Sequence, residues 1–533
     1  MAPSMVHLPN GQTLTVSPVF GGLAFKSNEW AVHRSAFPPG WTIILNEEDG
    51  DQDNEDDDAK EPEGVKKHTI HRYKKPTLQN DHMFISAIST PNSAEFKPAC
   101  SPTRQIAMMV WATLWWYFHQ AEPAPQLTTK ASAKTADDGK PKGEWVMNIN
   151  REGIFKSKNL LAKLERMGLI MSADSSVGTT PDDISGTNSR KMFISRRAFW
   201  QMDARIYLFT LSPVVNSPFP SGSPYSSRPT SPVRRAEGRS SPSPDGHAHA
   251  HDRAERSLTP MPSLPAQFAS NSHMPTYYPP HPAQYTFTNS IRHPMRPKPF
   301  RQGETFYTRY VPSVGQFLSF RVASLSPRPI SRQGPWSAQP FPTGAKSPLP
   351  HPSDSIIPTI GTMDLSADTD AELLHKWMND PRVAHFWGEA GPLAHQEEFL
   401  KKGLASKHSF PCIGCWNGKP FGYFEIYWVK EDALGKYLGG DVGDYDRGLH
   451  CLVGEQEFRG PHRVQIWLSA LVHYCWLSDM RTNAVMLEPR VDNTKLAQYC
   501  QQAGFYKEQE VTFPHKQSNL MKIRRDAWEK PAI

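Results

Sequence analysis

The chain has 533 residues, of which 50 are proline, 38% are hydrophobic and 21% are charged. At roughly 150 residues per domain this length would allow three or four domains, but proline and serine gather in the middle of the chain, and such a stretch buries too little apolar surface to offset the entropy of ordering. The formal net charge of +6 comes without a long run of Lys and Arg, which argues against a nucleic-acid-binding protein.

Cysteine usage and hydropathy indicate the compartment. The six cysteines are scattered in apolar contexts, which is typical of a reducing environment rather than of a secreted disulfide framework. The most apolar stretch, Ile106–Phe118, is shorter than the about 20 residues that a membrane-spanning helix needs. The start of the chain lacks a signal-peptide pattern, and Pro531–Ile533 does not match the SKL-type peroxisomal address. We therefore expect a cytoplasmic protein with no membrane or nucleic-acid partner.

Residues 1–212 are predicted to form the first folded domain. Short apolar runs broken by Gly and Pro indicate strands, and a longer apolar segment indicates a buried helix. The predicted elements are strands within Val6–Leu45, a strand at His82–Ser89, and helices at Arg104–His119 and Lys158–Met167, the last ending at Gly168. An acidic insert at 47–64 interrupts them. Nine of the twelve residues Glu47–Asp58 are acidic, which predicts a disordered, solvated loop, with a cation site as the alternative.

Residues 213–355 are predicted to be a long disordered linker rich in Pro and Ser. Within it, His247, His249 and His251 alternate like a metal-binding tract, but without a cysteine or a fixed scaffold, solvated histidines are favoured. The segment 303–326 differs because it is rich in aromatic and β-branched residues. It is predicted to form one or two strands that pack as an ordered arm on a folded domain.

Residues 356–530 are predicted to form the second folded domain, of the α/β (α+β) class. Its elements alternate, as in a mixed sheet with helices on its faces. The predicted strands are Ile357–Met363, Cys412–Trp416, Phe421–Trp428, Gly448–Gly454 and Ala484–Glu488, and the predicted helices are Ala371–Trp377, Leu393–Gly403 and Val464–Trp476. The tight turn Phe458–Val464 would point free backbone N–H groups and the positive end of a helix dipole at an anion.

This turn resembles the coenzyme A-binding motif of the GNAT acyltransferases, in which an Arg/Gln-x-x-Gly-x-Gly/Ala sequence holds the pyrophosphate. Arg459 and Gly460 are present, whereas His462 and Val464 stand where Gly and Gly/Ala are usual. Asn493, followed eleven residues later by Gly504, has the spacing of the same family. The resemblance implies no metal and no permanently bound cofactor, but acyl-CoA as a co-substrate. The implied CoA-binding residues are Leu452, Val453, Gly454, Arg459, Gly460, His462, Arg463, Val464 and Asn493.

The grouping of Asp446–His450 with Glu488, Pro489 and Asn493 is similar to the siderophore-biosynthesis branch of that family, whose members acylate N-hydroxylated lysine or ornithine. The long N-terminal region and the segment Gly303–Tyr310 resemble the fungal hydroxyornithine acyltransferases, in which a degenerate GNAT-like domain precedes the active GNAT domain. The resemblance implies transfer of acetyl from acetyl-CoA to N5-hydroxy-L-ornithine, which gives an iron-chelating hydroxamate. Transfer of a longer, anhydromevalonyl-type acyl group and a non-catalytic acyl-CoA-binding scaffold are the alternatives.

His450 and Glu488 are the candidate catalytic residues. Strand alternation puts His450 on the face opposite its apolar neighbours, and the resemblance makes it the residue that hydrogen-bonds the substrate hydroxyl. Glu488, at the carboxyl end of the neighbouring strand, would accept a proton or fix the substrate's amino group. The structural alternatives are a His450 bonded to a backbone carbonyl and a Glu488 in a salt bridge with Arg490 or Arg481.

Other conspicuous residues are interpreted as structural. Cys412 and Cys415 have CxxC spacing but lie in a predicted strand without a second pair, so core packing is favoured over zinc or redox chemistry. GNAT enzymes often place the tyrosine that protonates the leaving thiolate where this chain has Cys500, and Tyr499 points about 100° away around the helix. A homo-oligomer is compatible with the sequence. The tryptophans expected in the core are Trp111, Trp115, Trp116, Trp467 and Trp476.

Overall fold

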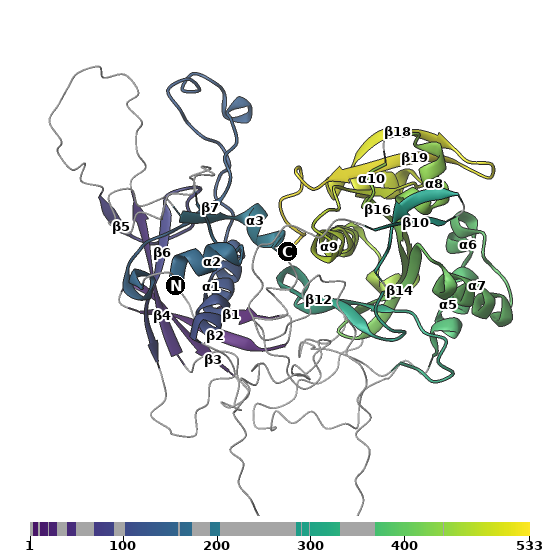
Figure 1. The fold of residues 1–533 in the computed structure, drawn as a ribbon, viewed down its shortest axis with the longest axis horizontal. Helices are drawn as coiled ribbons and strands as arrows, with labels where there is room; N and C mark the ends of the chain where they lie inside the picture. The colour runs from purple at the N-terminus through teal and green to yellow at the C-terminus, as the bar shows by residue number, and fades with distance from the viewer. Residues whose placement is uncertain are drawn as a thin grey trace, which may run out of the picture.

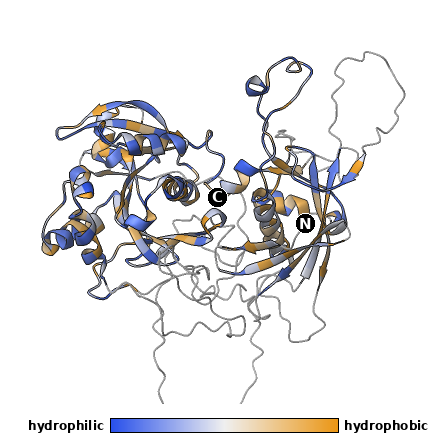
Figure 2. Cartoon of the chain, turned by 180° about the vertical axis from the view of Figure 1, so that it is seen from behind, coloured by the Kyte–Doolittle hydropathy of each residue, from blue (hydrophilic) through white to orange (hydrophobic). Residues whose placement is uncertain are grey.

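A computed structural model describes residues 4–8, 11–19, 21–28, 40–48, 69–89, 102–157, 160–172, 192–202, 284–288, 290–297, 299–330, 368–440 and 442–533. These residues form two lobes, one drawn in purple to blue and the other in teal to yellow (Figure 1). Apolar residues concentrate inside each lobe, and the outer loops are hydrophilic (Figure 2). The buried residues of the first lobe and those on the α9 (Pro461–Ser478) side of the second sheet form one continuous hydrophobic cluster, which joins the lobes.

The second lobe contains a mixed sheet. Among the described residues, eight strands pair in the order β12-β13-β14-β15-β16-β17-β19-β18. Every neighbouring pair is antiparallel except β16 and β17. The strands are β12 Thr305–Val311, β13 Gln316–Val322, β14 Ser409–Trp416, β15 Lys419–Trp428, β16 Arg447–Val453, β17 Ala484–Leu487, β18 Tyr506–Thr512 and β19 Gln517–Arg524. The mixed sheet predicted for this part of the chain is confirmed.

Helices cover both faces of this sheet. The long helix α9 packs on one face, where Trp467 lies 5.2 Å from Phe424 of β15 between ring centroids. Tyr423, the residue before Phe424 on β15, points to the other face and packs with Trp377 of α5 and Leu400 of α7. The short helix α6 was not predicted from the sequence. The helices are α5 Asp370–Met378, α6 Pro381–Trp387, α7 Leu393–Ala405, α8 Ala433–Tyr437, α9 Pro461–Ser478 and α10 Thr494–Gln502.

The first lobe is built around a second sheet. Nine of the described strands belong to it, in the order β1-β2-β3-β4-β6-β7-β9-β8 with β5 paired to β4. The strands are β1 Ser4–His7, β2 Thr13–Val19, β3 Gly22–Ser27, β4 Gly40–Glu48, β5 Ile70–Arg72, β6 Asp81–Ser89, β7 Val146–Ile149, β8 Met171–Ser172 and β9 Met192–Ser195. The helices are α1 Pro102–Phe118, α2 Leu160–Arg166 and α3 Arg196–Trp200.

The two sheets share one topology. In the described residues the first sheet has a single parallel pair, β6 and β7, which corresponds to β16 and β17 in the second. The long helix of each lobe, α1 or α9, connects the two strands of that pair. Beyond the parallel pair, the orders β7-β9-β8 and β17-β19-β18 also correspond. The expected GNAT-like character of the N-terminal half is therefore supported by its strand order.

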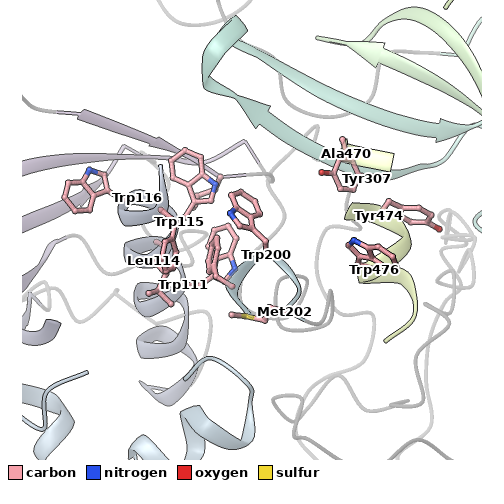
Figure 3. Close-up of a cluster of buried hydrophobic side chains, with 14 of the residues drawn as sticks. Trp111, Leu114, Trp115, Trp116, Trp200, Met202, Tyr307, Ala470, Tyr474 and Trp476 are labelled. Atoms are coloured by element: carbon pink, nitrogen blue, oxygen red, sulfur yellow. The ribbon is translucent and has the colours of Figure 1, made fainter. Parts of the chain in front are cut away.

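The lobes meet at α3, α9 and the C-terminal tail, residues 525–533. Arg196 of α3 forms an ion pair with Glu529 of the tail. His473 of α9 lies between the Tyr307 hydroxyl at 2.9 Å and the Trp200 carbonyl at 2.8 Å. Figure 3 shows Trp200 between the tryptophans of α1 and the aromatic side chains of α9. The tryptophans predicted for the core are all buried: Trp111, Trp115, Trp116, Trp467 and Trp476.

Two segments differ from the predicted linker. A hairpin of β10 Tyr285–Thr288 and β11 Ile291–Pro294 is followed by Arg296, which donates two 2.6 Å hydrogen bonds to the buried carboxylate of Glu431 in the second lobe. The predicted arm at 303–326 forms β12 and β13, which are paired strands of the second-lobe sheet rather than an appendage, and nearly every residue along them is buried. The sheet of the second lobe therefore begins well before residue 356.

Several predicted features lie outside the described residues. They are the strand at Ile357–Met363, the histidine tract at His247–His251 and all but the first two residues of the acidic insert. Within the part of the chain that the structure describes, no helix has the length and apolar character needed to cross a membrane.

Candidate active site

A row of polar side chains lies on one face of the second sheet. Tyr423, Glu425 and Tyr427 alternate along β15 and therefore point to the same side. Glu425 is the cross-strand partner of His450 on β16. Glu488 directly follows β17, which pairs with β16 on its other side. Three central strands thus bring two carboxylates and one imidazole together.

Short hydrogen bonds link these groups into a chain. Glu425 Oε2 lies 2.7 Å from His450 Nδ1, and Glu488 Oε1 lies 2.6 Å from His450 Nε2. The second oxygen of each carboxylate accepts from a tyrosine hydroxyl at 2.8 Å, Tyr423 for Glu425 and Tyr427 for Glu488. Each ring nitrogen of His450 faces a carboxylate oxygen, so a doubly protonated ring satisfies both contacts. His450 is therefore an imidazolium held between two carboxylates.

The electrostatics of the chain agree with this assignment. Burial would lower the pKa of His450, but the charges and hydrogen bonds of Glu488 and Glu425 outweigh it, and the pKa lies well above its usual value. Burial would raise the pKa of Glu488, but His450, Lys516 and Tyr427 lower it to about 2. At neutral pH the site holds a cationic ring and an ionised Glu488.

The three charged groups differ in access. The His450 side chain is 32% exposed, that of Glu425 is 18% exposed and that of Glu488 is 4% exposed. The ring of Tyr427 lies 4.7 Å from that of His450, and Trp387 at the end of α6 approaches the same ring edge-on at 6.4 Å. A ligand would therefore meet His450 first, between aromatic side chains.

An opening between β16 and β17 lies beside this row. The two strands pair only at Arg447–Val485 and Gly448–Met486. Gly448 allows the close packing below the opening, since a Cβ there would lie 2.0 Å from the Tyr427 ring. Beyond Gly448, β16 has no neighbouring strand on its β17 side among the described residues. This open edge of β16 runs to Leu452 and Val453. Backbone groups along it can therefore bind an extended ligand.

The predicted CoA turn lies at the end of the same strand. Arg459 donates hydrogen bonds to the Val453 carbonyl, the shorter at 2.7 Å, and so closes the turn after Gly454. Gly460 is the N-cap of α9 and has φ 127°, a conformation that favours glycine. In the described residues the N–H groups of Gly460 and His462 donate to no protein acceptor, so they are the donors that remain for an anion.

The structure corrects two members of the predicted CoA set. Arg463 is buried, donates to Gln316 at 2.7 Å and stacks over Trp416, so its guanidinium joins α9 to β13 instead of facing a phosphate. Val464 is also buried. The reason is that α9 begins at Pro461, three residues earlier than predicted, which turns both side chains toward the sheet.

The helix α10 begins at Thr494, directly after Asn493. Asn493 caps this helix by accepting from the N–H of Leu496 at 3.2 Å, which leaves its NH2 group for a ligand. Cys500, which stands where GNAT enzymes often have a tyrosine, is fully buried. Burial raises the pKa of its thiol well above the usual value. Cys500 is therefore a core residue.

The structural alternatives are settled by geometry. His450 bonds carboxylates rather than a backbone carbonyl. Arg490 pairs with Asp492 and Arg481 pairs with Asp479, so neither is the partner of Glu488. Cys412 and Cys415 are buried in the core, as expected. The residues that the structure describes include no cluster of three or more His, Cys, Asp or Glu side chains that could hold a metal ion.

Sequence reasoning missed Glu425 and the two tyrosines. The signal was present, because a glutamate in the otherwise apolar and aromatic strand Phe421–Trp428 shares its face with Tyr423 and Tyr427. The pairing of Glu425 with His450 depends on the register between two strands about 25 residues apart, which the sequence does not specify.

The corresponding strands of the first lobe carry different side chains from those of the second lobe. Its strands β4 and β6 correspond in sheet order to β15 and β16. Their central cross-strand pairs are Ile43–Ile85 and Ile44–Phe84, which are apolar. At the end of the same strands, His82 of β6 lies 3.6 Å from the Glu48 carboxylate of β4. Its other ring nitrogen lies 2.9 Å from the amide oxygen of Asn150, which directly follows β7. The first lobe therefore has an amide after β7, where the second lobe has the carboxylate of Glu488 after β17.

Comparisons with known proteins are consistent with a GNAT domain in the second lobe. Residues 366–513 match the family described as "Acetyltransferase (GNAT) domain". The chain is 46% identical over 559 residues to the N5-hydroxyornithine acetylase sidL of Beauveria bassiana, covering 97% of this chain and 100% of that protein. It is 38% identical over 235 residues to the N(6)-hydroxylysine O-acetyltransferase of Escherichia coli, covering 44% of this chain and 60% of that protein. It is also 47% identical over 160 residues to the N(5)-hydroxyornithine:cis-anhydromevalonyl coenzyme A-N(5)-transacylase of Beauveria bassiana, covering 30% of this chain and 35% of that protein.

Proposed function

Because the chain belongs to the hydroxyornithine and hydroxylysine acyltransferases of the GNAT family, we propose that it transfers acetyl from acetyl-CoA to the hydroxylamine nitrogen of N5-hydroxy-L-ornithine. In this reaction the nitrogen attacks the thioester carbonyl, a C–N bond forms and the C–S bond breaks. The proton lost by nitrogen is balanced by the proton gained by the CoA thiolate. The product is a hydroxamate, the chelating group of hydroxamate siderophores.

The observation that carries the proposal is the chain Glu425–His450–Glu488 beside the opening between β16 and β17. A hydroxylamine is much less basic than an alkylamine and is already neutral near pH 7. It needs positioning more than deprotonation before attack, and positioning is the larger source of rate for such a step. A cationic His450 is suited to donating a hydrogen bond to the hydroxyl oxygen and unsuited to removing a proton from an alkylammonium.

Glu488 is the proposed proton acceptor. Its pKa of about 2 makes it a weak base. The nitrogen of the tetrahedral intermediate carries positive charge and an electronegative oxygen, so its N–H is strongly acidic and a weak base suffices. In the free protein His450 Nε2–H donates to Glu488 Oε1 at 2.6 Å. When the acceptor binds, this N–H would donate to the hydroxyl oxygen instead, and Glu488 Oε1 would become free to accept the N–H of the substrate.

Acyl-CoA is proposed to bind along the open edge of β16 and at the start of α9. Backbone groups on the open edge of β16, which ends at Leu452 and Val453, would pair with the pantetheine amides. Two groups at the end of this edge are already used, because the Val453 carbonyl accepts from Arg459 and the Gly454 N–H donates to the Phe421 carbonyl at 2.9 Å. The N–H groups of Gly460 and His462 would hold the pyrophosphate, with the α9 dipole adding a favourable field. Arg459 would shape this turn from behind through its bond to the Val453 carbonyl.

Acetyl is the proposed acyl group. The full-length similarity to a protein named as an acetylase supports it. The rival is a longer anhydromevalonyl-type acyl group, since a 160-residue stretch is 47% identical to a transacylase of that name. Rates with acetyl-CoA and with the longer acyl-CoA, measured side by side on N5-hydroxyornithine, separate the two, and a higher kcat/KM for the longer donor would replace acetyl.

The direct test is release of free CoA from acetyl-CoA in the presence of N5-hydroxyornithine or ornithine. We expect turnover with the hydroxylated acceptor and a preference of at least about a hundredfold over ornithine, because a site built for a hydroxyl rejects the analogue that lacks it. Binding of CoA without turnover on either acceptor would show a non-catalytic acyl-CoA-binding scaffold instead.

A further inference from the structure

Glu425 lies on β15 directly opposite His450, in the centre of the sheet. Its carboxylate is held at both oxygens, by the Tyr423 hydroxyl at 2.8 Å and by His450 Nδ1 at 2.7 Å. Tyr423 is itself fully buried, in contact with Trp387 and Phe399. Glu425 is therefore a fixed group with a built support, and the reaction proposed above does not use it.

We propose that Glu425 is a positioning residue for the acyl transfer, which keeps His450 doubly protonated and holds its Nε2–H beside Glu488 as the hydrogen-bond donor for the hydroxylamine oxygen. This assignment rests on the proposed function and adds to it the group that sets the state of the histidine. Glu425 makes no contact with the reacting atoms in this scheme.

The need for such a group follows from the chemistry of imidazole. A neutral imidazole has one N–H and one bare nitrogen, and its proton can sit on either side. If Nε2 were the bare nitrogen, the site would present two acceptors, Nε2 and Glu488, to a hydroxylamine. With a carboxylate also on Nδ1, both nitrogens keep a proton, and the site presents one donor and one acceptor.

Other charged and titratable groups around the ring are accounted for. Tyr427 packs against His450 and donates to Glu488, and Lys516, from the turn between β18 and β19, lies 3.6 Å from Glu488 Oε1. Trp387 faces the ring from α6 and carries no charge. Glu488 alone could favour the cation, but it is the group that must also accept the substrate proton, so the second carboxylate keeps the ring protonated while Glu488 is engaged.

The experiment compares wild type with Glu425→Gln, which keeps the size of the side chain and removes its charge. The His450 ring is followed by NMR in the full chain labelled at histidine, with its signal assigned by loss in His450→Asn. We expect the midpoint of the ring titration to lie well above that of a free imidazole in the wild type and to fall by at least one pH unit in Glu425→Gln. An unchanged midpoint would overturn the proposal.

Kinetics supply the second readout. For Glu425→Gln we expect kcat/KM for N5-hydroxyornithine to fall about tenfold or more at pH 8 and to recover partly as the pH is lowered, while the KM for acetyl-CoA stays within twofold. Glu425→Asp, which keeps the charge, should retain more activity than Glu425→Gln. A pH-independent loss equal in both variants would mean that Glu425 only supports the fold, and a wild-type rate in Glu425→Gln would also overturn the proposal.

Glu398→Gln is the matched control, because Glu398 lies on α7, is 52% exposed and forms an ion pair with the exposed Lys401 at 3.9 Å. It should leave both readouts unchanged. The NMR titration does not require turnover, so a wild type that fails to acylate N5-hydroxyornithine would refute the proposed function while the shift in Glu425→Gln still decides whether Glu425 sets the protonation of His450.

Discussion

Replacing His450 with alanine removes the cation between two carboxylates. In the intact protein the ring makes hydrogen bonds of 2.7 Å and 2.6 Å to Glu425 and Glu488. A hydrogen bond from a charged donor contributes about 1.5–3 kcal/mol. At about 1.4 kcal/mol per tenfold in rate, loss of the donor to the hydroxyl oxygen corresponds to roughly a 10- to 150-fold fall in kcat/KM.

Loss of His450 also changes Glu488. This carboxylate is 4% exposed, and the remaining cation, Lys516, lies 3.6 Å from its Oε1. Burial raises the pKa of a carboxyl group, and without the imidazolium the pKa of Glu488 should rise from about 2. In the wild type Glu488 is ionised throughout pH 5 to 8, so an acid limb in that range should come only from protonation of the hydroxylamine itself. The variant should lose further activity as the pH falls, because Glu488 then takes up a proton.

The assay is kcat/KM for N5-hydroxyornithine from pH 5 to 9, with KM for acetyl-CoA measured alongside. The KM for acetyl-CoA should stay within about twofold, since the opening and the α9 turn are not changed. His71→Ala, an exposed histidine on β5 of the first lobe, is the control. A rate within twofold of wild type, or a fall that has the same pH dependence as wild type, would refute the reasoning.

Three further changes test other parts of the structure. Gly460→Ala forces a side chain into φ 127°, so KM for acetyl-CoA should rise about tenfold with little change in KM for the acceptor, and an unchanged KM in initial-rate assays would remove the turn from the CoA site. Arg463→Leu should lower Tm by a few degrees, because it removes the buried bond to Gln316, and should leave KM for acetyl-CoA unchanged; a raised KM would restore Arg463 to the CoA site. Arg321 donates two hydrogen bonds of 2.7 Å and 2.6 Å to the buried carboxylate of Asp370. Arg321→Met removes this cation and leaves the carboxylate buried without it, which should lower the free energy of unfolding by about 3–5 kcal/mol. Adding Asp370→Asn should recover part of that loss in thermal unfolding, and equal Tm values for the single and double variants would contradict the assignment.

The sequence predicted the centre of the second lobe well. The sequence placed the strand containing His450, the helix α9 and the strand ending at Glu488 to within a few residues. Each of these elements has a strong apolar pattern, and the turn Phe458–Val464 separates the first strand from the helix. Placing His450 and Glu488 on neighbouring strands was enough to predict their proximity, and the structure joins them at 2.6 Å.

Long-range pairing accounts for what was missed. β12 and β13 read as an arm, because proline-rich sequence surrounds them and nothing local indicates that they pair with β14 about 90 residues later. Glu425 was missed for the same reason, since its role comes from a cross-strand register. Arg463 was misassigned because a three-residue error in the start of α9 rotates a side chain from the opening to the core.

We propose that this protein acylates the nitrogen of a hydroxylamine. The most direct measurement is the identity of the product made from acetyl-CoA and N5-hydroxyornithine, isolated and tested for iron(III) binding and for mass. We expect a product heavier by one acetyl group that forms a coloured iron(III) complex, because an N-acylated hydroxylamine is a hydroxamate. A product of the same mass that does not bind iron(III), as expected if the acetyl group is on oxygen, or no product at all, would contradict it.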